Sequence, residues 1–150
     1  SVDPPTWEKV ESFKKMHDAP DGARYFFYAN IGPKRLSKEE KAETYKNGKI
    51  PYRITCRLTE GRHVNGKWRT VEVKGQVNVV VVNPKGETIF AKRLNLSGMS
   101  IKGGPQSGYF DTVNESGKYT MYIWIEHNGV TYGIVDSTTL WKTIKPHGMK

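Results

Sequence analysis

The sequence predicts a mainly β protein, an antiparallel β-sandwich with one or two short helices near its N-terminus. From residue 51 onward, apolar and polar residues alternate with a period of two, which is typical of strands that bury one face. Two Asn-Gly pairs, Asn65-Gly66 and Asn128-Gly129, interrupt this alternation. Asn-Gly favours two-residue hairpin turns because both positions need a positive φ. Alternating strands joined by such turns predict antiparallel sheets.

The chain of 150 residues is long enough for one core and short enough for a single domain. We expect residues 1–50 to form a helical or irregular extension that packs on a β-sandwich formed by residues 51–145. The longest apolar run, Val79–Val82, is too short to cross a bilayer, so no transmembrane segment is expected. The one cysteine, Cys56, cannot form an intrachain disulfide, so the fold does not depend on oxidation.

The N-terminal region contains the first predicted helix. Trp7, Val10, Phe13 and Met16 recur at near-helical spacing, which predicts a helix over residues 6–17. Such a helix has an apolar stripe that must be buried against the sandwich.

A strand and a second helix are expected next. The aromatic stretch 24–31 predicts a short strand, and residues 37–45 predict a charged, solvated helix. Ser37 and Glu40 have the spacing of a capping box, in which each side chain accepts a hydrogen bond from a backbone N–H near the helix start.

The Asn65-Gly66 turn predicts a long hairpin. The strand before the turn presents one apolar face, formed by Tyr52, Ile54, Cys56 and Leu58. If the pairing continues along the whole hairpin, Leu58 lies opposite Val73 and Arg57 lies opposite Lys74.

The middle of the chain predicts further strands. Residues 76–82 are apolar on both faces near their end, which indicates a central strand. A tight turn is expected at 83–86 and a returning strand at 88–94. Residues 97–107 predict a glycine-rich loop, and residues 108–112 a short strand.

The Asn128-Gly129 turn predicts the last hairpin. Its register places Trp124 opposite Gly133, and a large aromatic residue beside a strand glycine is a stabilising arrangement. The residues then expected in the core are Tyr119, Met121, Ile123, Ile125, Tyr132 and Ile134. A final strand is expected over 138–143, before a loose tail.

The segment Glu115–Met121, with the sequence Glu-Ser-Gly-Lys-Tyr-Thr-Met, resembles the tyrosine corner of immunoglobulin-like sandwiches. In that motif a tyrosine follows a glycine by two positions, and a disulfide cysteine follows the tyrosine by two. Met121 stands at the cysteine position here, so the disulfide of antibody domains is absent. The resemblance implies an immunoglobulin-like β-sandwich and does not imply a function.

No catalytic or metal motif stands out. The four histidines include no His-x-x-x-His pair, and one cysteine cannot supply a thiolate cage. There is no Gly-x-Ser-x-Gly elbow, and Gly103-Gly104-Pro105 lacks the Lys-Ser/Thr of a phosphate-binding loop. We therefore expect a protein that is not an enzyme and that holds neither cofactor nor metal.

Positive charge is concentrated in the middle of the chain. The net charge is +9, and residues 51–100 contain nine lysines and arginines against three acidic residues. A basic face attracts phosphate, sulfate or acidic surfaces, although a net charge also serves solubility alone. The candidate anion-binding residues are Arg53, Arg57, Arg62, Lys67, Arg69 and Lys74.

The outward face of the last hairpin supplies a second candidate. Tyr122 and Trp124 would form an aromatic platform for stacking a sugar, peptide or base if they were exposed. The alternative is that the N-terminal helix covers them with Trp7, Phe13 and Met16.

These features predict a non-enzymatic binding or accessory module of the cell envelope or extracellular space, which recognises another protein through an edge strand or loops. The alternative is a binder of an anionic polymer, such as nucleic acid, an acidic glycan or a lipid head group, through the basic sheet face. The chain begins at Ser1 rather than methionine, which indicates either a removed signal peptide or an artificial start. We favour the signal peptide, and with it a secreted or periplasmic protein. A cytoplasmic location also fits a single cysteine.

Overall fold

The computed structural model describes residues 4–12, 16–31, 37–97, 100–112 and 115–140. In chain order the elements are η1 (Trp7–Lys9), β1 (Glu11–Ser12), β2 (Met16–Asp18), β3 (Arg24–Ile31), α1 (Lys38–Asn47), β4 (Lys49–Val64), β5 (Lys67–Glu72), β6 (Gln76–Val82), β7 (Thr88–Ser97), β8 (Ser100–Ile101), β9 (Gln106–Asp111), β10 (Gly117–His127) and β11 (Val130–Leu140). The predicted mainly β, antiparallel fold is confirmed, with β1 and β11 as the one parallel pair among the described strands.

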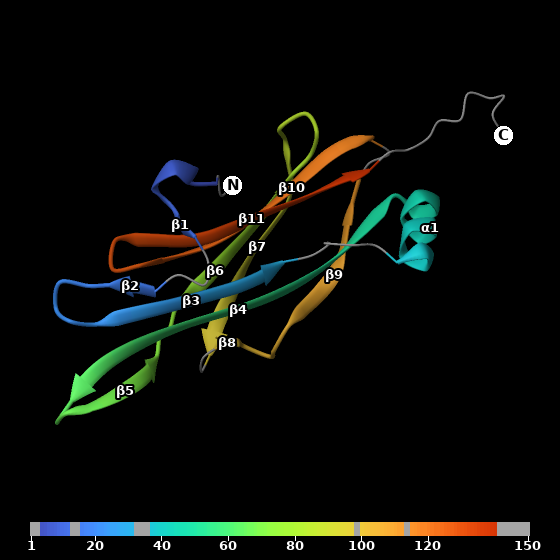
Figure 1. Ribbon diagram of the computed structural model, residues 1–150. Helices are drawn as coiled ribbons and strands as arrows, with labels where there is room; N and C mark the ends of the chain where they lie inside the picture. The colour runs from blue at the N-terminus through green and yellow to red at the C-terminus, as the bar shows by residue number, and fades with distance from the viewer. Residues whose placement is uncertain (1–3, 13–15, 32–36, 98–99, 113–114, 141–150) are drawn as a thin grey trace, which may run out of the picture.

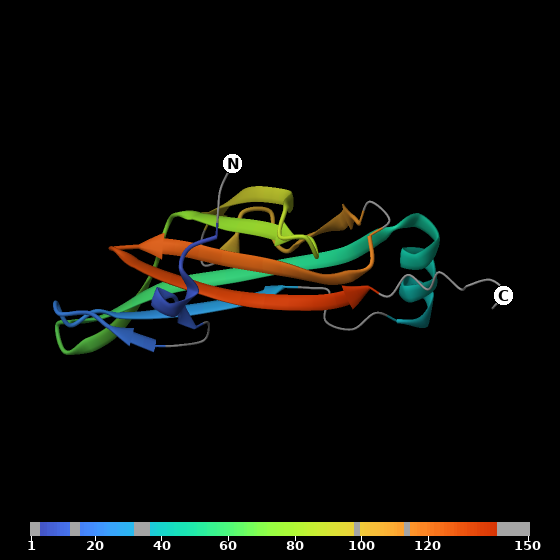
Figure 2. The ribbon, with the colours of Figure 1, turned by 90° about the horizontal axis from the view of Figure 1, so that it is seen from above.

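The strands form two sheets that face each other across the core (Figures 1 and 2). Sheet A has the order β1-β11-β10-β6-β7-β8. Sheet B has the order β2-β3-β4-β5, and β9 pairs with the first part of β4. The immunoglobulin-like arrangement is not confirmed, because sheet B curls into a half-barrel around the 16-residue strand β4.

The register predicted for the last hairpin is confirmed along its whole length. Asn128 and Gly129 have φ values of 49° and 75°, as the turn requires. Trp124 lies opposite Gly133, and the pairing extends from His127 back to Gly117.

The register predicted beyond the tip of the other hairpin is wrong. Asn65 and Gly66 form the expected turn, but β5 pairs with β4 only as far as Thr59 opposite Glu72. The chain then crosses to sheet A, where β6 lies between β10 and β7 as a central strand. Val73 and three valines of β6, namely Val77, Val79 and Val81, are buried in the core.

The predicted helix over residues 6–17 is also wrong. The chain forms the short 3-10 turn η1 and then the strands β1 and β2, and Phe13 lies outside the described residues. Pairing with β11 and β3 uses the backbone groups that a helix would have satisfied internally.

The second predicted helix is confirmed as α1. Its capping box is formed, since the Ser37 hydroxyl accepts from the Glu40 N–H at 3.1 Å and the Glu40 carboxylate accepts from the Ser37 N–H at 3.1 Å. Within the described residues, no helix is long and apolar enough to cross a membrane.

The tyrosine corner forms as the sequence motif suggests. The Tyr119 hydroxyl lies 2.8 Å from the Thr112 carbonyl oxygen and 2.6 Å from that of Glu115, and these two acceptors share its one proton. Its side chain is 1% exposed, so the corner ties the end of β9 to the start of β10 inside the core.

The core is made by the inward faces of both sheets. Five of the six residues predicted for it in the last hairpin are buried, namely Tyr119, Met121, Ile123, Ile125 and Tyr132, and Ile134 is partly buried. Cys56 is buried, as its place on the apolar face of β4 predicts. The last strand runs unbroken through β11 to Leu140, so no separate strand begins at residue 138, and residues 141–150 lie outside the described part.

Candidate functional site

The outer face of sheet B, which points away from the core, is the candidate binding surface. Along β3 and β4, exposed or half-buried residues alternate with buried ones, so each strand presents one face outward. Pairing between the strands brings the outward residues into one surface. Its members are Arg24, Phe26, Tyr28, Arg53, Thr55, Arg57, His63, Trp68 and Tyr109.

Trp68 is held flat at one end of this face. A Cβ on Gly61 would clash with the Trp68 ring, so the missing side chain is what lets the ring lie across the β4 backbone. The His63 ring packs against Trp68 edge-on at 5.0 Å between centroids, and the Arg24 guanidinium lies 5.7 Å from the ring centre. Trp68 remains 40% exposed, so part of this aromatic ring is accessible to solvent.

Two more aromatic side chains are exposed along the same face. Phe26 is 41% exposed beside the Trp68 end, and Tyr109 is 63% exposed at the opposite end, facing Pro51 on β4. At about 3.3 Å per strand residue, Pro51 and His63 lie about 40 Å apart along β4. The face therefore has aromatic contacts at both ends of a long, curved strand.

Arg53 and Arg57 lie between these aromatic residues. Both are exposed, and neither forms an ion pair with any residue that the structure describes. Arg57 lies opposite Tyr28, and Arg53 lies opposite Ser107. The predicted like-charge pair of Arg57 with Lys74 does not exist, because β5 ends before Lys74.

The other predicted cations lie elsewhere. Arg62, Lys67 and Arg69 have the opposite strand parity and point to the other side of the β4–β5 tip, and Lys74 follows the end of β5. Arg62 and Arg69 are a like-charge cross-strand pair. Two carboxylates offset this repulsion, since Arg62 donates to Asp21 at 2.7 Å and also pairs with Glu60.

The Asp21–Arg62 ion pair shifts the pKa of both side chains. The hydrogen bond from Arg62 lowers the pKa of the Asp21 carboxyl and raises that of the guanidinium. Arg62 is therefore already occupied by carboxylates and is a weaker candidate for an anion site than Arg53 or Arg57.

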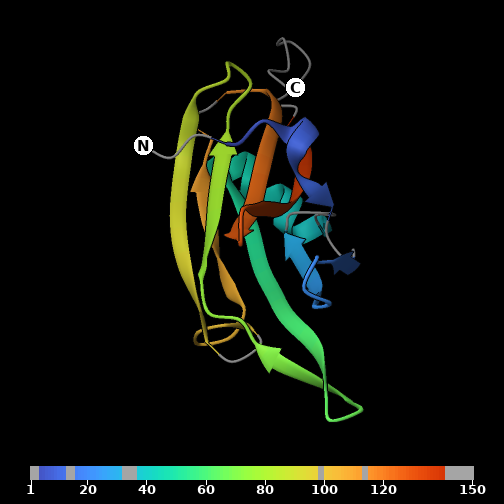
Figure 3. The ribbon, with the colours of Figure 1, turned by 90° about the vertical axis from the view of Figure 1, so that its left-hand side faces the viewer.

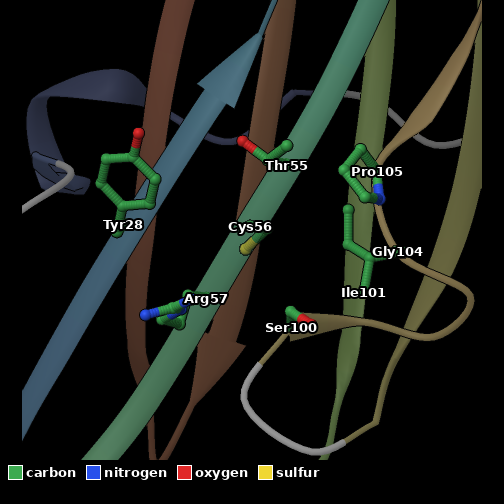
Figure 4. A pocket seen from close by; sticks show the side chains of 8 residues that line it. All are labelled: Tyr28, Thr55, Cys56, Arg57, Ser100, Ile101, Gly104 and Pro105. Carbon is green, nitrogen blue, oxygen red and sulfur yellow. The ribbon is translucent and has the colours of Figure 1, made fainter.

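A pocket of about 220 Å³ opens beside β4 in the middle of the outer face (Figure 4). It lies between β4 and the segment that carries β8 and the start of β9. Its lining residues are Tyr28, Thr55, Cys56, Arg57, Ser100, Ile101, Gly104 and Pro105.

Two polar groups in the pocket lining, the Thr55 hydroxyl and the Cys56 thiol, are buried. The Thr55 hydroxyl is buried and has no hydrogen-bond partner among the described residues. Burial raises the pKa of the Cys56 thiol to about 12, so at neutral pH the sulfur is protonated and is not a nucleophile.

The chain matches no family model, no curated protein and no solved structure. Among the described residues, no group of three or more histidine, cysteine or carboxylate side chains could hold a metal ion.

Tyr122 and Trp124 do not form an open platform. The Trp7 ring stacks on Tyr122 at 5.2 Å and meets Trp124 edge-on at 6.5 Å, which leaves Trp124 only 3% exposed. The N-terminal segment thus covers this face as the alternative expected, but it does so from η1 rather than from a helix. The Trp7 ring, not that of Trp124, lies directly over Gly133.

The predicted anion-binding residues include Arg53 and Arg57 of the candidate face, but sequence reasoning missed others, among them Phe26, Thr55, Trp68 and Tyr109. The alternation within 24–31 already separates Phe26 and Tyr28 from the buried Tyr25 and Phe27. The Asn65-Gly66 register also places Trp68 beside His63. The position of Tyr109 had no comparable signal, because β9 pairs with β4 across more than forty intervening residues.

Proposed function

We propose that the protein is a non-enzymatic binding module that holds an anionic polymer on the outer face of sheet B. The observation that carries the proposal is the exposed pair Arg53 and Arg57, which has no carboxylate partner in the described chain and lies between exposed aromatic rings. Unpaired arginines attract phosphate or sulfate, and exposed rings stack on bases or sugars.

A charge-reversal experiment tests this proposal. We expect Arg53→Glu plus Arg57→Glu to abolish retention on heparin and to weaken binding of a fluorescent single-stranded oligonucleotide at least tenfold at 0.1 M salt, because two phosphate contacts become repulsive. The matched control is Lys67→Glu plus Arg69→Glu, which changes the net charge equally on the other side of the hairpin tip.

The salt dependence of binding refines the same test. Each lost phosphate contact lowers the slope of log K against log salt by about 0.7 for a single strand. The outer-face variant is expected to lose more of this slope than the control. Equal losses in both variants would show that only the overall charge attracts the polymer, and the proposed face would be wrong.

Trp68 supplies a second readout that does not depend on charge. Trp68→Ala removes a stacking surface, which for one base is worth about 1–3 kcal/mol. We expect weaker oligonucleotide binding with an unchanged salt slope. Val71→Ala is the matched control, since Val71 is also exposed on β5 but lies on its other face.

Recognition of a protein partner through an edge strand is the second candidate. Among the described residues, β3 pairs with β2 only over Arg24–Phe26, and no described strand pairs with residues 27–31 on that side. β11 likewise pairs with β1 only at Tyr132 and Gly133. A partner strand added to either edge would slow amide exchange there and would tolerate high salt, whereas polymer binding would not.

The compartment and the finer fold class are also proposals. We favour a secreted or periplasmic protein, which fractionation of the native host with an antibody would test. The Tyr119 hydrogen bonds support a distorted immunoglobulin-like sandwich.

A further inference from the structure

We propose that the pocket beside Thr55 and Arg57 is a binding site for a phosphate group. The inference rests on the proposed function, since it identifies the part of the polymer that would occupy the middle of the outer face. It names phosphate chemistry, which a nucleic acid, a phospholipid head group or free phosphate could each supply.

The pocket exists because sheet B has a gap. β9 pairs with β4 only up to Ile54, and β5 pairs on the same side only from Thr59 onward. Residues 55–58 of β4 therefore have no strand partner on that side among the described strands. The segment Ser100–Pro105 lies alongside this gap and leaves a hollow on the outer face (Figure 4).

The groups around the hollow are donors. Arg57 offers a guanidinium that forms no ion pair with any described residue, and Thr55 and Ser100 offer hydroxyl groups. The Thr55 hydroxyl is buried without a partner, which is unfavourable unless a ligand accepts its hydrogen bond. None of the lining residues is an aspartate or glutamate, so no lining side chain carries a negative charge.

The size and shape of the pocket select the ligand. Its volume of about 220 Å³ lies below the ~300–1,000 Å³ of typical small-molecule sites, so it accommodates a single group and not a whole nucleotide. The lining donors come from two separate segments, β4 and the segment with Ser100, and the several oxygens of a tetrahedral anion can accept hydrogen bonds from both. Ile101 and Pro105 supply an apolar wall that shields the charged contact from water.

Inorganic phosphate is the probe, and the binding curve is followed by backbone amide NMR. We expect saturable shifts of the Thr55, Ser100 and Gly104 amides with a millimolar Kd. Thr55→Val keeps the side-chain shape and removes the hydroxyl, so phosphate affinity should fall about tenfold, as for loss of one hydrogen bond to a charged group. Arg57→Gln should abolish saturation. Lys67→Gln, at an exposed lysine on the other side of the β4–β5 tip and outside the pocket lining, should retain the affinity within about twofold.

Several outcomes would overturn the inference. Acetate binding as tightly as phosphate would show that the site does not select a tetrahedral anion. Shifts that do not saturate, or that Thr55→Val leaves unchanged, would show that phosphate does not occupy the pocket.

The proposed function and this inference fail separately. If Thr55→Val leaves oligonucleotide binding intact while Arg53→Glu plus Arg57→Glu abolishes it, the face binds polymer and the pocket proposal is wrong. If phosphate saturates the pocket but neither heparin nor oligonucleotide binds, the polymer proposal is wrong and the pocket stands. Vesicles containing phosphatidic acid form the third arm, and binding to them alone would identify a lipid head group as the phosphate source.

Discussion

The two Asn-Gly hairpins share turn chemistry and differ in what surrounds them. Both asparagines lie near φ 50°, and both turns set the local register that their residues predict. The β10–β11 pairing then extends over eleven residues, whereas the β4–β5 pairing stops after six. The β4–β5 tip projects past the other strands (Figure 3). A turn therefore decides where pairing begins, and burial decides how far it continues.

The same contrast appears at two glycines that each lie under a tryptophan. Trp7 packs on Gly133 and is itself part of a stack with Tyr122 and Trp124. Trp68 packs on Gly61 and remains 40% exposed. The first contact covers Tyr122 and Trp124 on the outer face of sheet A, and the second leaves an aromatic ring partly exposed on the outer face of sheet B. The same arrangement thus covers aromatic side chains in one sheet and leaves a partly exposed ring in the other.

Truncating one side chain in each hairpin is expected to give the largest difference in the free energy of unfolding. Ile123→Ala removes a fully buried side chain from β10 and should lower the free energy of unfolding by about 3 kcal/mol. Val71→Ala, at a position 50% exposed on β5, should change it by less than about 0.5 kcal/mol. Urea denaturation measures both. Equal losses would mean that the tip is as tightly packed as the core hairpin.

Adding a methyl group at the two glycines tests the tryptophan contacts. An ideal Cβ on Gly133 would lie 2.7 Å from the Trp7 ring and 2.9 Å from Val10, so both must move. We expect Gly133→Ala to cost about 2 kcal/mol, as for overpacking in a covered site. Gly61→Ala should cost less than about 1 kcal/mol, because the exposed Trp68 ring can swing into solvent.

The indole N–H signals of Trp7 and Trp68 identify which ring moved in each variant. Gly61→Ala should shift the Trp68 signal and weaken oligonucleotide binding while the protein stays folded. If Gly61→Ala leaves binding unchanged, the flat Trp68 ring is not part of the polymer surface.

Substitution of the two turn asparagines is expected to have a smaller effect. A non-glycine residue at positive φ is unfavourable, and alanine lacks the local hydrogen bonding that helps asparagine adopt it. Asn128→Ala should cost about 1.5 kcal/mol, because the Asn128 amide also donates to the Tyr25 hydroxyl at 3.0 Å. Asn65→Ala should cost about 0.5 kcal/mol by the same thermal or urea measurement. The reverse order would contradict the view that the β10–β11 turn is anchored by the opposite sheet.

Much of the fold follows from local signals. The turn residues and the alternation within each strand are properties of a few neighbouring positions, so β10, β11, α1 and the tight turn at Asn83 are predictable. The Asn83 side-chain oxygen accepts from the Lys85 and Glu87 N–H groups at 2.9 Å, which is the role expected of asparagine in such a turn. Sheet membership is not local, and β6 joins sheet A because its valines are buried there between β10 and β7.

The candidate site was less predictable for the same reason. Arg53 and Arg57 are identified by alternation alone, but their neighbours come from β3, β5 and β9 through long-range pairing. The N-terminal helix failed because the spacing of Trp7 and Val10 fits a helix and equally fits a short segment that lies across β11. Periodicity identifies which residues are apolar together, and it does not identify the surface that they cover.

The smallest predicted effect is a pH dependence located at the β10–β11 tip. Burial lowers the pKa of His127 from its ordinary value of 6.5, and the neighbouring Glu60 opposes this shift only in part. The His127 ring packs against Tyr25 at 4.8 Å, and its Nε2 is buried without a partner among the described residues. Because the unfolded chain then binds a proton more readily than the folded one, stability should fall as the pH decreases below about 6.5.

The expected loss between pH 7 and pH 5 is below about 1 kcal/mol, since the site is partly solvated. This loss is measured from the urea midpoints of the wild type and of His127→Gln at pH 7 and pH 5. The substitution should reduce the difference between the midpoints at the two pH values. His63→Gln is the matched control at the exposed tip of the other hairpin and should leave the difference unchanged. The opposite outcome, in which His63→Gln reduces the pH dependence of stability and His127→Gln does not, would contradict this prediction. The two hairpins would then not differ in the way that we expect from the burial of His127.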